Sequence, residues 1–88
     1  MNNPRRKEIA ELVKRAQELA DLMSTLKDDI ETVKDEESEY YENMPESLQM
    51  SDRGIKAEEA VGQLDSAMYE LENVDFDSLV SSLEQAAE

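Results

Sequence analysis

The chain of 88 residues contains no cysteine, no histidine and no tryptophan. No disulfide can therefore staple the fold, and the His and Cys ligands typical of zinc sites are missing. Two glycines and two prolines leave few places for turns. A chain this short without staples depends on very regular helix packing or on self-association for its stability.

Long apolar runs are missing as well. No stretch approaches the ~20 apolar residues that span a bilayer. The basic residues Arg5, Arg6 and Lys7 are not followed by an apolar signal core, because Glu8 and Glu11 interrupt it. We therefore expect a cytoplasmic protein that does not associate with membranes.

The formal net charge of −14 is unevenly distributed. Residues 1–34 hold seven basic and seven acidic side chains, whereas residues 35–88 hold two basic and sixteen acidic ones. Such a field repels nucleic acid and anionic membrane surfaces and favours a protein partner with a basic surface. Direct binding of nucleic acid is not expected.

Apolar residues recur at alternating steps of three and four through the first half of the chain. This a/d heptad predicts a helix over about residues 4–43 that packs as a coiled coil or bundle. Val13, Ala20 and Leu22 widen the stripe, which is typical of a bundle with more than two helices, and Glu37 falls out of the pattern. The heptad positions are Ile9, Leu12, Ala16, Leu19, Met23, Leu26, Ile30 and Val33.

Capping and breaking residues predict where this helix starts and stops. Asn3 is a good N-cap, and Pro4 suits the first helical position. Pro45 cannot continue a helix, so we expect a corner over residues 44–52, after which Ser51 caps the next helix. Leu48 and Met50 are expected to cover the end of the core.

A second helical segment is predicted over about residues 53–87. Its apolar spacing slips between residues 73 and 77, where cap-type residues surround Asp75. The helix either breaks there or continues with a phase shift, and the pattern favours near-continuity with a local irregularity. The core candidates are Ala57, Val61, Leu64, Met68 and Leu71, followed by Phe76, Leu79, Val80 and Leu83.

These elements predict an all-α fold, a single domain built as a long antiparallel helical hairpin. No segment alternates with the period of two that a strand requires. Two helices that each bury one stripe form a marginal structure, and a dimeric four-helix bundle would bury the remaining apolar surface. We therefore predict a homodimer.

Nothing in the chain recommends catalysis, a metal site or a cofactor. The serines have no base beside them, and there is no glycine-rich phosphate loop. The carboxylates follow a helical pattern and radiate from it, instead of converging as loop ligands for calcium do. We expect a protein that is not an enzyme.

The acidic run beside the corner has two interpretations. One is a solvated helix surface that only keeps the protein soluble. The other is an interaction surface whose carboxylates stand in for the phosphates of nucleic acid in a partner's basic groove. The candidate residues are Asp35, Glu36, Glu39, Glu42 and Glu46.

A second candidate surface is a stripe along the C-terminal segment. Small residues at one end would admit another backbone, and two aromatic rings could anchor a dimer mate or a target. The alternative is that Phe76 and Val80 rejoin the core after the slip, which leaves Tyr69 alone. The stripe consists of Gly62, Ser66, Tyr69, Phe76 and Val80.

The corner carries a recognisable pattern. Residues 43–54 read N-x-P-E-x-L-Q-x-S-x-R-G, preceded by Glu39-Tyr40-Tyr41-Glu42. This segment resembles the corner of small acidic helical-hairpin proteins of Firmicute phages and prophages. The resemblance implies a phage or mobile-element origin, a bacterial host cell and a helical hairpin, and it brings no assigned activity or functional residue.

Two functions remain open at this point. The leading hypothesis is a non-enzymatic, phage-type protein that binds another protein, as a nucleic-acid mimic that inhibits a host nucleic-acid-binding or defence protein. The alternative is a structural or assembly protein whose heptads and stripe mediate oligomerisation.

Overall fold

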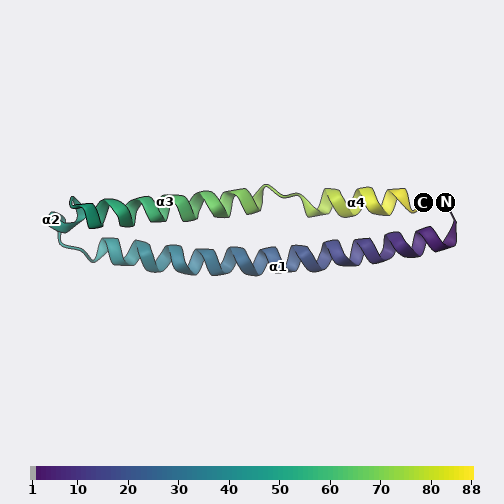
Figure 1. Ribbon diagram of the computed structural model, residues 1–88, viewed down its shortest axis with the longest axis horizontal. Coiled ribbons are helices and arrows are strands. Elements are labelled where there is room, and N and C mark those ends of the chain that lie inside the picture. The colour runs from purple at the N-terminus through teal and green to yellow at the C-terminus, as the bar shows by residue number, and fades with distance from the viewer. Residues whose placement is uncertain (1) are drawn as a thin grey trace. The chain divides into compact units, whose positions relative to one another are not determined.

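The computed structural model describes residues 2–88, which form helices and no strand, so the predicted all-α class is confirmed. One long helix is followed by a short one and then by two of intermediate length (Figure 1). The elements are α1 (Asn3–Glu42), α2 (Glu46–Gln49), α3 (Asp52–Glu72) and α4 (Phe76–Ala86).

The chain divides into two compact units. The terminal unit comprises Met1–Thr25 and Val74–Glu88, and the corner unit comprises Leu26–Asn73. Helix α1 contributes residues to both units, whereas α4 belongs to the terminal unit and α2 and α3 belong to the corner unit.

In the terminal unit, α4 returns antiparallel to the first part of α1. The Arg6 guanidinium Nε, near the start of α1, donates a hydrogen bond of 3.1 Å to the carbonyl oxygen of Ala87, just after the end of α4. Farther along α1, Leu19 lines the same groove as Leu79 and Leu83 of α4. The later a residue lies in α1, the earlier its neighbour lies in α4, as a hairpin requires.

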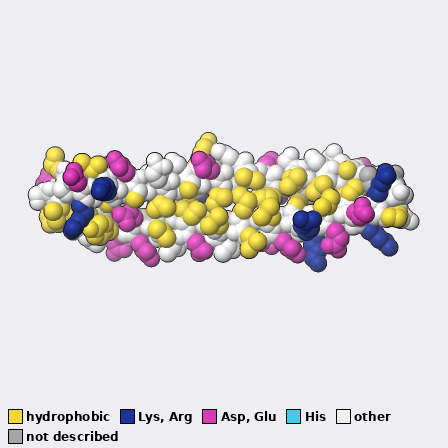
Figure 2. All heavy atoms as spheres, viewed as in Figure 1, with side chains coloured by type: hydrophobic (Ala, Val, Ile, Leu, Met, Phe, Trp, Pro, Cys, Tyr) yellow, Lys and Arg dark blue, Asp and Glu magenta, His cyan; other side chains and the backbone are white. Residues whose placement is uncertain are grey.

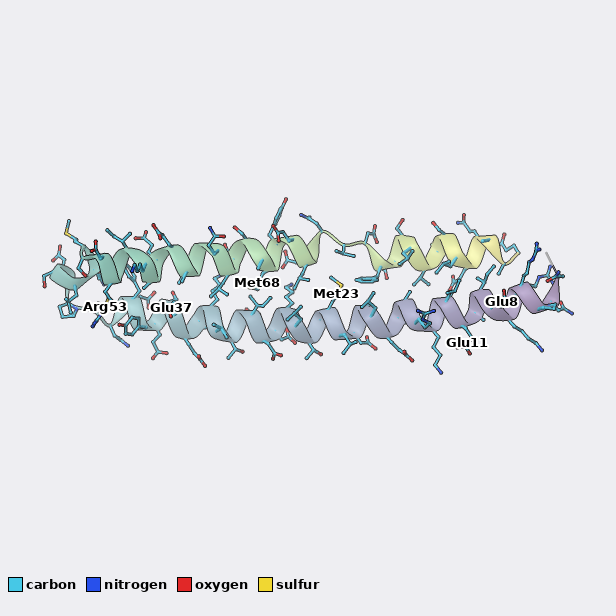
Figure 3. All side chains as sticks on the ribbon, viewed as in Figure 1. Glu8, Glu11, Met23, Glu37, Arg53 and Met68 are labelled. Atoms are coloured by element: carbon cyan, nitrogen blue, oxygen red, sulfur yellow. The ribbon has the colours of Figure 1, made fainter. Side chains whose placement is uncertain are left out.

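In the corner unit, α3 is antiparallel to the second part of α1. Lys27 Nζ lies 2.7 Å from Glu72 Oε1, and Lys34 Nζ lies 2.8 Å from Asp65 Oδ1. Met68 lies between Asp65 and Glu72 in the chain, and Figure 3 shows it extending from α3 toward α1. The predicted antiparallel pairing is therefore present within this unit too.

The main effect of the two ion pairs is to fix the register between α1 and α3. The hydrogen bond to Glu72 and its negative charge raise the pKa of Lys27 above 10.5, and the hydrogen bond to Asp65 raises the pKa of Lys34. A raised lysine pKa stabilises the fold fully below pH 10.5, and this contribution is lost as the pH rises through the raised value. Because the pairs are solvent-exposed, their net contribution to stability is small, and they serve to fix which turns of α1 and α3 face each other.

The start of α1 differs by one residue from the sequence prediction. The helix begins at Asn3, and the side chain that caps it is Asn2, whose Oδ1 accepts a hydrogen bond of 3.0 Å from the backbone N–H of Arg5. The predicted cap, Asn3, is already helical. Two adjacent asparagines offer the same capping chemistry, and the sequence pattern alone does not distinguish them.

At the corner, Pro45 precedes α2 and Ser51 precedes α3. Ser51 occupies the N-cap position, but its hydroxyl donates to the carbonyl oxygen of Leu48 and makes no cap to α3, which corrects the predicted role. Gln49 Nε2 donates a hydrogen bond of 3.1 Å to the carbonyl oxygen of Tyr41 at the end of α1. Met50 is 78% exposed and so does not cover the core end as expected.

The near-continuous helix expected over residues 53–87 is instead two helices. Helix α3 ends at Glu72, and α4 begins at Phe76. Between them, Asp75 adopts a non-helical backbone (φ −96°, ψ 87°), and its carboxylate accepts a hydrogen bond of 2.9 Å from the N–H of Ser78. A carboxylate that satisfies a free N–H favours a new helix start over continuation of the old helix.

Asp75→Ala is expected to lower the free energy of unfolding by about 1 kcal/mol, because it removes this cap. Urea unfolding followed by circular dichroism measures the change. Asp77→Ala is the matched control, since it removes the same charge from the first turn of α4 without removing a cap. Equal losses for the two variants would show that only the charge at Asp75 matters.

Neither unit has a closed apolar core. Among the residues described, the hydrophobic side chains classed as buried are those of Ala16 and Ala57. Many larger ones are half-exposed, with Leu19 at 50% and Leu22 at 68%. On the face drawn in Figure 2, hydrophobic side chains reach the surface where α1 faces its returning helix in each unit.

Candidate interaction surfaces

The five predicted acidic residues all lie in the corner unit and are all solvent-exposed. Four of them belong to the last turns of α1, and Glu46 is the acidic residue in the first turn of α2. None takes part in an ion pair within 4.0 Å in the described chain. We call this set the acidic surface: Asp35, Glu36, Glu39, Glu42 and Glu46.

Charge differs strongly between the two units. The corner unit holds four basic and fifteen acidic side chains, a formal charge of −11, and the terminal unit holds five and eight, a formal charge of −3. In the corner unit, Lys27 and Lys34 are already paired with carboxylates of α3. The acidic surface therefore lies in a unit with few free cations to neutralise it.

The predicted C-terminal stripe is not carried by one helix. Gly62, Ser66 and Tyr69 are exposed on α3 of the corner unit, where Tyr69 is 65% exposed. Phe76 and Val80 are half-buried on α4 of the terminal unit. The stripe is divided because the chain is interrupted between α3 and α4. This geometry matches the alternative in which Phe76 and Val80 join the apolar packing.

The terminal unit has an open apolar groove that the sequence did not indicate as a site. Its volume is about 470 Å³, and it is formed by α1 and α4. Two charged side chains of opposite sign, Arg15 and Glu18, belong to its lining. We call it the leucine groove; its apolar lining consists of Leu12, Ala16, Leu19, Leu22, Leu79 and Leu83.

One signal in the sequence points to this groove. Leu22 lies outside the a/d series, and a two-helix coiled coil buries apolar residues only at the a and d positions. In the structure it is the most exposed leucine of the groove, at 68%. A wide apolar stripe indicates a further packing partner, but the stripe alone does not say which part of the chain stays uncovered.

Residues 2–88 contain no cluster of three or more histidine, cysteine, aspartate or glutamate residues that could hold a metal ion. Within that range, none of the helices combines the length and apolar character needed to cross a membrane.

Comparison with known proteins finds no matching family model, no matching curated protein and no matching solved structure. Two surfaces of this chain, the acidic surface and the leucine groove, are the features that bear on its function.

Proposed function

We propose that this protein is not an enzyme and acts by binding a protein with a basic surface through its acidic surface. The observation that supports this is the exposure of all five carboxylates in a unit of formal charge −11. A field of this strength attracts basic partners over distances of about one Debye length, ~8–10 Å at physiological salt.

The most concrete form of the proposal is nucleic-acid mimicry. Asp35, Glu39 and Glu42 follow one another at steps of four and three residues on α1. At 1.5 Å per residue, their carboxylates repeat roughly every 4.5–6 Å along the helix. DNA phosphates repeat at ~3.4 Å along one strand, so this row of carboxylates presents somewhat more than half the linear charge density of a single strand to lysines and arginines that neutralise phosphates. A phage-encoded inhibitor of a host nucleic-acid-binding or defence protein would use such a surface.

The test is capture of host proteins on the immobilised chain at 50 and 200 mM salt, with and without competing duplex DNA. We expect the amount of captured partner to fall at least tenfold at the higher salt, and we expect DNA to displace the partner. Salt weakens the contacts of the partner's basic side chains, and DNA competes for the same side chains. Replacing Glu36, Glu39 and Glu42 together with glutamine should abolish capture.

The matched control replaces Glu58, Glu59 and Glu70 of α3 with glutamine. These residues are exposed in the same unit and the charge change is the same, so capture should weaken only modestly. Equal losses for both triple variants would mean that net charge alone acts, and capture that ignores salt and DNA would contradict mimicry.

The second candidate is an assembly function, and the leucine groove favours it. Two units that each leave half-exposed leucines or valines gain stability when a second copy covers them. In this version a dimeric four-helix bundle forms and the acids only provide solubility. The two candidates differ in the role of the acidic surface, which binds a partner in the first and only keeps the protein soluble in the second.

A further inference from the structure

The leucine groove leaves several large apolar side chains about half-exposed to solvent. Leu12 is 42% exposed, Leu19 is 50% exposed and Leu79 of α4 is 46% exposed. These side chains line one groove with Leu22, and so they form one contiguous apolar area. Contiguous apolar surface of this kind marks a contact site, because covering it removes the area from water in one step.

The charges in the groove indicate what covers it. Arg15 and Glu18 have opposite signs and lie three residues apart on the same stretch of α1. Neither is in an ion pair within 4.0 Å in the described part of the chain. A surface that carries one charge of each sign is complementary to itself when the two-fold axis passes between the two charges, because each residue then meets the other residue of the pair.

Net charge also favours the terminal unit as the meeting point of two copies. It carries −3, whereas the corner unit carries −11. Contact through the corner units would bring the larger like charges together, and this repulsion opposes association. Contact through the leucine grooves avoids most of it.

We infer that the leucine groove is the interface of an isologous homodimer in which the two α1 helices cross antiparallel near Ala16. A two-fold axis at this position places Arg15 beside Glu18 of the partner subunit, and Glu18 beside Arg15 of the partner subunit. The same register brings Leu12 within about one residue, ~1.5 Å along the helix axis, of the level of Leu22 of the partner subunit. This inference rests on the self-association proposed above and adds its surface, its direction and its charge pairs.

The test is a charge exchange in the full chain, read by sedimentation velocity. Arg15→Glu and Glu18→Arg should each raise the dimer dissociation constant at least tenfold, because each variant places like charges opposite one another twice. An equimolar mixture of the two variants should recover the dimer, since every pair is then of opposite sign. The double variant carrying both changes should recover it as well.

Lys14→Glu and Asp21→Arg are the matched controls, since both residues are exposed on α1 and outside the groove. They should leave the dissociation constant within about twofold, and circular dichroism should show all variants equally helical. A monomeric wild-type chain at 100 µM would overturn the self-association itself. A dimer that both single variants leave intact, or that the mixture fails to recover, would overturn this interface while leaving self-association standing.

Discussion

Gly54→Ala is expected to lower the free energy of unfolding by about 1–3 kcal/mol, the usual cost of forcing extra volume into a packed site. Gly54 is buried in the first turn of α3. A Cβ built there would lie well inside 3.0 Å of the main chain of Gln49, at the end of α2. The obstacle is backbone and cannot rotate away, so the α2–α3 junction would have to open.

The control for this prediction is the other glycine. Gly62 is exposed in the middle of α3, and a Cβ there would meet no atom within 4 Å. Gly62→Ala should raise the free energy of unfolding by about 0.5–1 kcal/mol, because alanine loses less backbone entropy in a helix. Urea unfolding of both variants checks the opposite signs. A stabilising Gly54→Ala would show that α2 does not pack closely against α3.

Ala57→Glu is the second change with a large expected effect. Ala57 is 3% exposed and is the most buried hydrophobic side chain that the structure describes. A carboxylate placed there would lose its hydration in a unit that already carries −11. The expected cost is roughly 3 kcal/mol, typical of a buried charge without a partner.

The measurement is again urea unfolding, and Gln63→Glu provides the comparison. Gln63 is exposed on the same helix, so this variant adds the same charge without burying it. We expect a change of less than about 0.5 kcal/mol, as for ordinary surface substitutions. A similar loss in both variants would assign the effect to charge repulsion across the unit instead of to burial.

The sequence predicted the helices well where one pattern dominated. The heptad from Ile9 to Val33 is uninterrupted, and α1 follows it with an error of one residue at its start. The interruption at Asp75 was harder to predict, because a phase slip in the apolar pattern fits both a bent helix and a broken one. The capping hydrogen bond to Ser78 decides between them, and it is a matter of local geometry.

The interaction surfaces show the same limit. Exposure of acids such as Glu36 and Glu39 follows from helical spacing and could be predicted. The leucine groove could not, because its lining combines α1 with Leu79 and Leu83, which the apolar pattern had assigned to a core. A periodic pattern predicts which side chains avoid water, but two helices are too few to cover all of them.

Several residues of the corner segment, residues 43–54, have structural roles. Pro45 occupies the N-cap position of α2, and the amide of Gln49 binds the carbonyl oxygen of Tyr41 at the end of α1. Gly54 allows α3 to start against α2. The described residues include no left-handed backbone, so this corner turns through a short helix and not through a glycine turn. The corner pattern is therefore explained by the way in which the chain turns.

The interruption between α3 and α4 also has a consequence for local unfolding. Helix α4 has 11 residues, below the ~12–15 at which an isolated helix becomes marginally stable in water. Its hydrogen-bond ladder is not continuous with that of α3, so α4 can melt without unwinding α3. We therefore expect α4 to open as a local segment at a lower free energy than the whole chain. Because α4 supplies one wall of the leucine groove, the groove would lose that wall whenever α4 unfolds.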